Sequence, residues 1–163
     1  MPAQHFDKTD LKILATLQRD GRLSNVELAE TVALSPSPCL RRLKQLEESG
    51  VIRQYVALLE PARLGLGLQA FVRVSLEKRG TTYAKQFSEA VSHWQEVINC
   101  FAMTGEMDYL LQVYFEDLEH FSRFVMDKLL QHPGVADVKS SFVLHEVKRS
   151  TALPLNHLES ILS

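Results

Sequence analysis

Basic and amide side chains recur at helical spacing in the segment that runs from Ser35 to Gly50. Arg41, Arg42 and Gln45 would share the outer side of one helix there. In the major groove of DNA, arginine pairs with the edge of guanine and glutamine with the edge of adenine, while serine hydroxyls and free amides at a helix start suit phosphate oxygens. The types and spacing of these residues therefore predict a helix that enters DNA with its N-terminal end first.

Two short helices joined by a tight turn would position these side chains. Ser24 and Glu27 have the spacing of a capping box at the start of the first helix. Ser35 is expected to cap the second helix, Pro36 suits its first turn, and Gly50 suits its left-handed end. An ordinary helical hairpin without DNA contact is the alternative that these features leave open. The residues expected at the DNA surface of this helix-turn-helix are Ser24, Asn25, Ser35, Ser37, Pro38, Arg41, Arg42 and Gln45.

A further helix is expected over residues 7–20, with Asp7 as its cap and Gly21 after its end. Three helices are then enough to enclose a shared core. Cys39 is expected to be a small core or half-buried residue rather than a redox sensor. We expect the core to contain Leu14, Leu17, Leu28, Val32, Leu40, Leu43 and Leu46.

The rest of the chain alternates between strand and helix patterns. Residues 51–59 are rich in β-branched and aromatic side chains, which is typical of a strand, and Gly65 and Gly67 mark a break after them. Beyond the break, period-two runs predict strands and period-3.6 runs predict helices. The expected elements are strands over 69–77, 97–103, 108–115 and 135–147, helices over 82–94 and 118–131, and a turn over 104–107.

The order β-α-β-β-α-β predicts a four-stranded antiparallel sheet with both helices on one face. The fold class is therefore α+β, with an N-terminal three-helix, winged helix-turn-helix and a C-terminal ferredoxin-like domain. Because a bare apolar sheet face usually has a partner, we expect the chain to form a homodimer through the other face. The candidates for that face are Phe71, Val74, Phe101, Tyr114, Phe142 and Leu144. The expected domains are residues 1–54 for DNA binding, 55–67 as a linker strand or hinge, 68–150 as the ferredoxin-like domain and 151–163 as a tail.

Composition narrows the possible classes of protein. The 163 residues are 45% hydrophobic and 23% charged, as in globular domains, and the net charge is −2. Residues 1–60 hold eight Lys and Arg against eight Asp and Glu, so DNA binding would depend on a local basic cluster and on dimerisation. The two cysteines form no paired motif, and the six histidines are dispersed. We therefore expect no enzyme activity, catalytic residue, metal site or cofactor, and the absence of a signal or membrane-spanning segment favours the cytoplasm.

Several separate motifs, in order, resemble the Lrp/AsnC family of bacterial and archaeal transcription regulators, also called feast/famine regulators. The resemblance runs from about residue 7 to residue 148, and residues 140–141 and 146–148 are most similar to its leucine-responsive branch. The resemblance implies a DNA-binding helix-turn-helix and a ferredoxin-like domain that dimerises, with dimers that associate further, as in a tetramer of dimers. The matching segments are Asp7–Asp10 with Ile13 and Leu14, Gly21–Leu28, Leu34–Cys39, Thr104–Leu111, His132–Val135, Ser141–Leu144, and Val147 with Lys148.

The same resemblance implies that an amino acid binds where dimers meet, near the family's Gly-x-x-Asp-Tyr turn. Asp108 or Glu106 could pair with its ammonium group, and the turn amides with Gly105 could take its carboxylate. An apolar wall of Met107 and Phe142 favours leucine or methionine. Alternatively, Asp108 only caps the turn and Gly105 only supplies a positive φ. The expected effector residues are Ala102, Thr104, Gly105, Glu106, Met107, Asp108, Tyr109, Phe142 and Leu144.

Two other functions compete with a DNA-binding, nucleoid-associated regulator. A stand-alone amino-acid-binding module would use the same ferredoxin-like half, but the N-terminal helices argue against it. RNA binding by the sheet would need exposed aromatic residues flanked by basic ones, and residues 100–103 lack the basic partners.

Overall fold

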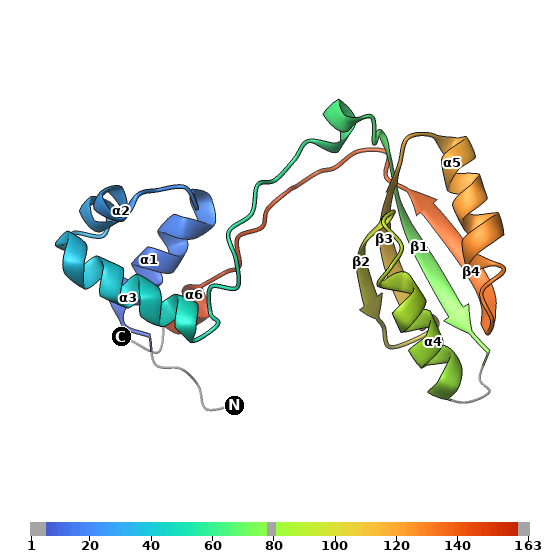
Figure 1. Cartoon of the computed structure of the whole chain (residues 1–163), viewed down its shortest axis with the longest axis horizontal. Coiled ribbons are helices and arrows are strands. Elements are labelled where there is room, and N and C mark those ends of the chain that lie inside the picture. The colour runs from blue at the N-terminus through green and yellow to red at the C-terminus, as the bar shows by residue number, and fades with distance from the viewer. Residues whose placement is uncertain (1–5, 78–80, 160–163) are drawn as a thin grey trace. The chain divides into compact units, whose positions relative to one another are not determined.

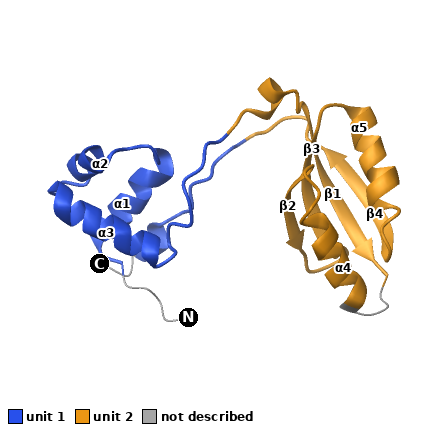
Figure 2. Cartoon of the chain, viewed as in Figure 1, with its two compact units in different colours: residues 1–58, 148–163 blue, residues 59–147 orange. Residues whose placement is uncertain are grey.

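The computed structural model describes residues 6–77 and 81–159 (Figure 1). The chain forms two compact units, which Figure 2 colours separately. Unit 1 combines residues 1–58 with residues 148–163, and unit 2 comprises residues 59–147. The first five residues of the expected DNA-binding domain and the last four of the expected tail lie outside the described residues.

Three helices form the body of unit 1: α1 (Lys8–Arg19), α2 (Asn25–Thr31) and α3 (Pro36–Glu48). Both predicted helix starts are confirmed, because Asp7 caps α1 and Ser24 caps α2, each in a reciprocal capping box. The turn between α2 and α3 needs a left-handed residue, which Ala33 supplies with φ 57°. The buried side chains of unit 1 include Leu11, Ile13, Leu14, Leu28, Ala29, Val32, Cys39 and Leu46.

The prediction that Leu40 belongs to this core is wrong. Leu40 is 40% exposed, whereas Cys39 is fully buried. Successive residues of an α-helix lie about 100° apart, so burying Cys39 turns Leu40 away from α1 and α2. Leu17 and Leu43 are partly buried against the same core.

The predicted strand over residues 51–59 is also wrong. Residues 53–60 belong to neither a helix nor a strand, and they leave α3 as an exit segment. The described residues offer this segment no strand to pair with, because the single sheet consists of four strands from unit 2. Tyr55 anchors the segment to α3, since its hydroxyl donates to Glu47 Oε1 at 2.9 Å.

Burial and the neighbouring Glu47 carboxylate raise the pKa of Tyr55 from its ordinary 10.0 to about 12. Because the folded state holds the phenol proton more tightly than the unfolded state, the stability from this contact is complete below pH 10 and is lost between pH 10 and about 12. We expect Tyr55→Phe to remove a late phenolate transition from the ultraviolet titration of the protein. Glu47→Gln, which keeps an acceptor without the charge, should bring that titration to lower pH; equal midpoints for Glu47→Gln and wild type would contradict the assignment.

The C-terminal segment returns to unit 1, although the expected domains separated residues 151–163 from residues 1–54 as a tail. Gln18 of α1 forms two hydrogen bonds with the backbone of Leu153: its amide donates to the carbonyl at 3.2 Å, and its carbonyl accepts from the N–H at 2.6 Å. Leu155 packs against the core, and the short helix α6 (Asn156–Glu159) follows beside α1. Residues 148–159 therefore complete unit 1.

Unit 2 has the predicted ferredoxin-like topology. Its sheet order is β2-β3-β1-β4, every adjacent pair is antiparallel, and helices α4 and α5 cover one face (Figure 1). A π-helical turn over Phe124–Leu129 continues α5. The elements are β1 (Leu68–Leu76), α4 (Thr81–Val91), β2 (Val97–Ala102), β3 (Tyr109–Phe115), α5 (Leu118–Arg123) and β4 (Val135–Phe142). The fourth strand is thus five residues shorter than predicted.

The register decides which side chains face the helices. Val74 is fully buried in the helix-side core, and the Phe142 ring lies 4.9 Å from the ring of Phe121 on α5. Their assignment to the open face is therefore wrong, and Leu144 lies beyond β4 with 98% of its surface exposed. Alternation along β1, β2 and β3 places Phe71, Phe101 and Tyr114 on the open face, together with Leu110.

Candidate DNA-binding surface and ligand site

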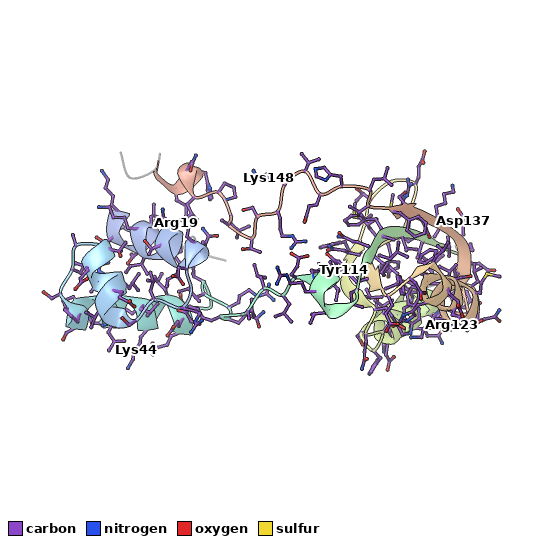
Figure 3. The ribbon with its side chains drawn as sticks, turned by 90° about the horizontal axis from the view of Figure 1, so that it is seen from above. Arg19, Lys44, Tyr114, Arg123, Asp137 and Lys148 are labelled. Atoms are coloured by element: carbon purple, nitrogen blue, oxygen red, sulfur yellow. The ribbon has the colours of Figure 1, made fainter. Side chains whose placement is uncertain are left out.

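Helix α3 presents one exposed face with basic and amide side chains. Ser37, Arg41, Lys44 and Gln45 are exposed along it, and Leu40 lies among them at helical spacing. Lys44 lies at the outer edge of unit 1 in Figure 3. This surface can offer guanidinium, ammonium and amide donors to DNA, and a leucine side chain to the methyl group of thymine.

Ser35 occupies the N-cap position of α3, but its side chain makes no capping hydrogen bond, which corrects the prediction. A cap accepts from the N–H of the second or third helical residue. The third residue is Pro38, which has no N–H, and Pro36 removes the first N–H as well. Of the two positions that could donate to the cap, only Ser37 has an N–H, and it forms no capping hydrogen bond with the Ser35 side chain. The Ser35 hydroxyl and the Ser37 N–H both lie at this exposed helix start.

Three of the sequence-predicted DNA residues use their side chains inside unit 1. The Ser24 hydroxyl accepts from the backbone N–H of Glu27. In return, hydrogen bonds from the Ser24 hydroxyl and N–H hold the pKa of the Glu27 side-chain carboxyl below its usual range. The Asn25 amide donates to the Pro36 carbonyl at 2.8 Å and joins the start of α2 to the start of α3. Arg42 forms ion pairs with Asp7 at 2.6 Å and Asp10 at 2.8 Å. The prediction that Arg42 faces outward is therefore wrong.

Sequence reasoning missed Leu40 and Lys44 as members of the exposed face. The sequence placed Cys39 in or near the core but also placed Leu40 there, and leaving Leu40 out would have rotated the helix and shown both residues on the exposed face. The charge balance also differs between the units: unit 1 holds ten Lys and Arg against eight Asp and Glu, and unit 2 holds eight against twelve. The unit that contains α3 therefore carries the positive excess.

Replacing Arg41 by alanine removes an exposed guanidinium from the centre of this face. We expect Arg41→Ala to weaken binding of a specific DNA duplex about fivefold to tenfold, which corresponds to roughly 1 kcal/mol for one base contact. Gel-shift titrations against specific and scrambled duplexes measure the change. Glu48→Ala, at the far end of α3, is the matched control. An equal loss on both duplexes would assign Arg41 to phosphate contact rather than base contact.

The turn between β2 and β3 holds most of the predicted effector residues. Thr104, Gly105, Glu106 and Asp108 are exposed there, Met107 is half-buried, and Gly105 has φ 110°, which favours glycine. Ala102 and Tyr109 form the pair of residues that closes the two strands before the turn.

Asp108 joins this turn to the end of β1. Its Oδ2 accepts from the N–H of Leu76 at 2.6 Å, and its own N–H donates to the Val74 carbonyl at 3.1 Å. Its carbonyl accepts from the N–H of Met103 at 2.9 Å and closes the turn. The Asp108 side chain is nevertheless exposed, so its carboxylate can both fix the turn and meet a ligand.

The remaining effector candidates lie elsewhere in the chain. The Tyr109 hydroxyl lies 3.4 Å from Ala84 O and Ser88 Oγ on α4, and its ring packs against Phe87, so it faces the helices. Phe142 pairs with Ala70, four residues along β1 from the Val74–Tyr109 pair. That separation is about 13 Å in a strand, so Phe142 does not reach the turn of its own chain. Leu144 lies further away, beyond the end of β4.

Within residues 6–77 and 81–159, no group of three or more His, Cys, Asp or Glu side chains could hold a metal ion. Among the same residues, no helix combines the length and the apolar character that crossing a membrane requires.

Comparison with known proteins supports both units. A family model described as winged helix-turn-helix DNA-binding matches residues 6–53, and one described as the Lrp/AsnC ligand binding domain matches residues 69–153. The first match argues against the stand-alone ligand-binding module. The leucine-responsive regulatory protein of Escherichia coli K12 is 40% identical over 152 residues, which cover 93% of each chain.

Solved structures agree with these matches. A transcriptional regulator from Neisseria meningitidis, solved as a complex with L-methionine, is 61% identical with a TM-score of 0.92 and covers 94% of this chain and 99% of its own. An AsnC family transcriptional regulator from Agrobacterium tumefaciens is 38% identical with a TM-score of 0.87 and covers 93% and 99%. These relatives are regulators of transcription rather than enzymes. The chain therefore belongs to the Lrp/AsnC family of transcriptional regulators, with an N-terminal DNA-binding domain and a C-terminal ligand-binding domain.

Proposed function

We propose that this regulator reads DNA through the exposed face of α3 and responds to an aliphatic amino acid, methionine ahead of leucine, that binds at the turn of residues 104–108. It acts on the bacterial nucleoid in the cytoplasm. The observation that carries the DNA part is the exposed row of Ser37, Arg41, Lys44 and Gln45 on the second helix of a helix-turn-helix. Such a row presents donors to base edges and phosphates along one groove.

The ligand part is supported by the chemistry of the turn. An amino acid carries an ammonium and a carboxylate, and the turn offers the exposed carboxylates of Glu106 and Asp108 and the backbone beside Gly105. Met107 is half-buried beside them and suits an unbranched apolar side chain. Methionine is placed before leucine because the 61%-identical Neisseria regulator was solved with L-methionine, whereas the leucine-responsive relative is 40% identical.

Self-association is supported by the open face of the sheet, which carries Phe71, Phe101, Leu110 and Tyr114, with Phe101 directly opposite Leu110. We propose that this face pairs with a second copy in a homodimer and that dimers associate further. An apolar wall from another subunit would complete the ligand site, because Phe142 lies too far along the sheet to reach the turn of its own chain. Ligand would then shift the assembly through its different affinity for the assembled states.

Two measurements test this proposal. Selection from a random pool of duplexes should enrich one pseudo-palindromic sequence whose half-sites lie about one helical turn apart. Calorimetry and light scattering with a panel of twenty amino acids should show that methionine binds and changes the size of the assembly. Failure to enrich any duplex would overturn the DNA part, and an unchanged heat and size across the panel would overturn the ligand part.

A further inference from the structure

We propose that Arg42 is a positioning residue of α3: it holds the DNA-reading helix against the start of α1 and makes no contact with DNA itself. This inference rests on the proposed function of α3. It assigns opposite tasks to two adjacent arginines, because Arg41 is exposed and Arg42 is turned toward α1.

The contacts of Arg42 form a closed network with the cap of α1. Nη1 of Arg42 lies 2.6 Å from Asp7 Oδ2 and 2.8 Å from Asp10 Oδ1. The other oxygen of each carboxylate belongs to the capping box: Asp7 Oδ1 accepts from the N–H groups of Thr9 and Asp10, and Asp10 Oδ2 accepts from the N–H of Asp7. All four carboxylate oxygens therefore have donors.

This arrangement makes the two carboxylates a rigid receptor for the guanidinium. The capping box holds both acidic side chains independently of Arg42. Forming the ion pairs therefore costs less side-chain conformational entropy than forming an ordinary surface pair. The acidic partners raise the pKa of Arg42. Burial acts to raise the pKa of Asp7, but the N–H of Asp10 and the guanidinium of Arg42 outweigh it and hold that pKa below its usual range. Arg42 would have to break both ion pairs to reach a phosphate.

The ion pairs of Arg42 with Asp7 and Asp10 lie where they can affect how α3 recognises a DNA sequence. Asp7 and Asp10 lie at the N-terminal end of α1, and Arg42 lies in the middle of α3 between the exposed Arg41 and the half-buried Leu43. A base contact requires the side chains of α3 to meet base edges in one register, whereas a phosphate contact tolerates small rotations. Loss of these two ion pairs should therefore reduce discrimination between DNA sequences more than it reduces total affinity for DNA.

The experiment compares three full-length variants on the selected duplex and on a scrambled duplex, over a range of salt concentrations. Arg42→Ala should weaken binding to the selected duplex about tenfold, leave the scrambled duplex unchanged and leave the log–log salt slope unchanged. Asp7→Asn with Asp10→Asn should reproduce this result, because asparagine still caps the helix but carries no charge. Arg42→Lys should restore part of the discrimination, since lysine keeps the charge without the planar fork.

Direct DNA contact by Arg42 predicts the opposite pattern. The salt slope of Arg42→Ala would then fall by about 0.9 for each lost phosphate contact, and both duplexes would weaken together. The paired asparagine variant would bind DNA more tightly, because the guanidinium would be released. Either result overturns the positioning role. Failure of the wild-type protein to enrich any duplex overturns the proposed function instead. If Arg42→Ala does not fold, the variant with Asp7→Asn and Asp10→Asn still tests the positioning role of Arg42.

Discussion

Removing residues 149–163 is expected to lower the free energy of unfolding of unit 1 by about 3 kcal/mol while unit 2 keeps its stability. The deletion eliminates two hydrogen bonds between Gln18 and Leu153, each worth about 1 kcal/mol. It also uncovers apolar surface that Leu155 covers, worth about 1 kcal/mol for a partly buried leucine. The lone tryptophan, Trp94, lies in unit 2, so its fluorescence reports that unit alone. Urea unfolding followed by circular dichroism should therefore show an early helical transition that the fluorescence does not follow.

Point variants separate the contacts that this deletion removes together. Gln18→Ala should destabilise unit 1 by about 1–2 kcal/mol, because both hydrogen bonds pass through its side-chain amide. Leu153→Ala is the matched control: its side chain is largely exposed, and its two hydrogen bonds are made by its backbone, so stability should stay near wild type. Coincident helical transitions in the full-length and shortened chains would contradict the docking of this segment.

Replacing Asp108 by alanine is expected to weaken methionine binding about thirtyfold and to destabilise unit 2 by about 1–2 kcal/mol. The binding loss corresponds to about 2 kcal/mol for a charge-assisted hydrogen bond to the ligand ammonium. The stability loss arises because the N–H of Leu76 loses the acceptor that lies 2.6 Å away. Calorimetry with L-methionine measures the first effect, and unfolding followed by Trp94 fluorescence measures the second.

Asparagine at the same position distinguishes the two roles of this carboxylate. Asp108→Asn keeps an acceptor oxygen for the N–H of Leu76 but has no charge for an ammonium group. We expect its unit 2 to be as stable as wild type and its methionine binding to be as weak as that of Asp108→Ala. Wild-type methionine affinity in Asp108→Asn would show that Asp108 only fixes the turn.

Local chemistry made much of the fold predictable. Capping boxes at Asp7 and Ser24 act within four residues, so the helix starts could be read directly from the sequence. Alternation along β1 and β3 reports burial on one side of a sheet, which gave the strands and their order. The return of Leu153 to Gln18 could not be predicted in this way, because it joins residues 135 positions apart and leaves no periodic signal.

The candidate site was less predictable for a related reason. The exposure of Ser37, Arg41 and Gln45 could be predicted, but the rotation of α3 depended on whether Leu40 entered the core. Because Leu40 is exposed instead, Arg42 is turned toward α1. The turn at Asp108 was identified from its motif. The distance of Phe142 from that turn depends on the register between β1 and β4, which sequence alternation alone does not specify.

The path of the backbone through unit 1 sets the order in which the protein can mature on the ribosome. Residues 148–159 belong to unit 1 but are synthesised after the whole of unit 2. Domains that are contiguous in sequence can fold as they emerge, and unit 2 meets this condition. Nascent chains should therefore complete unit 2 before unit 1, and α1 should gain its last neighbours only when Leu153 and Leu155 have left the exit tunnel.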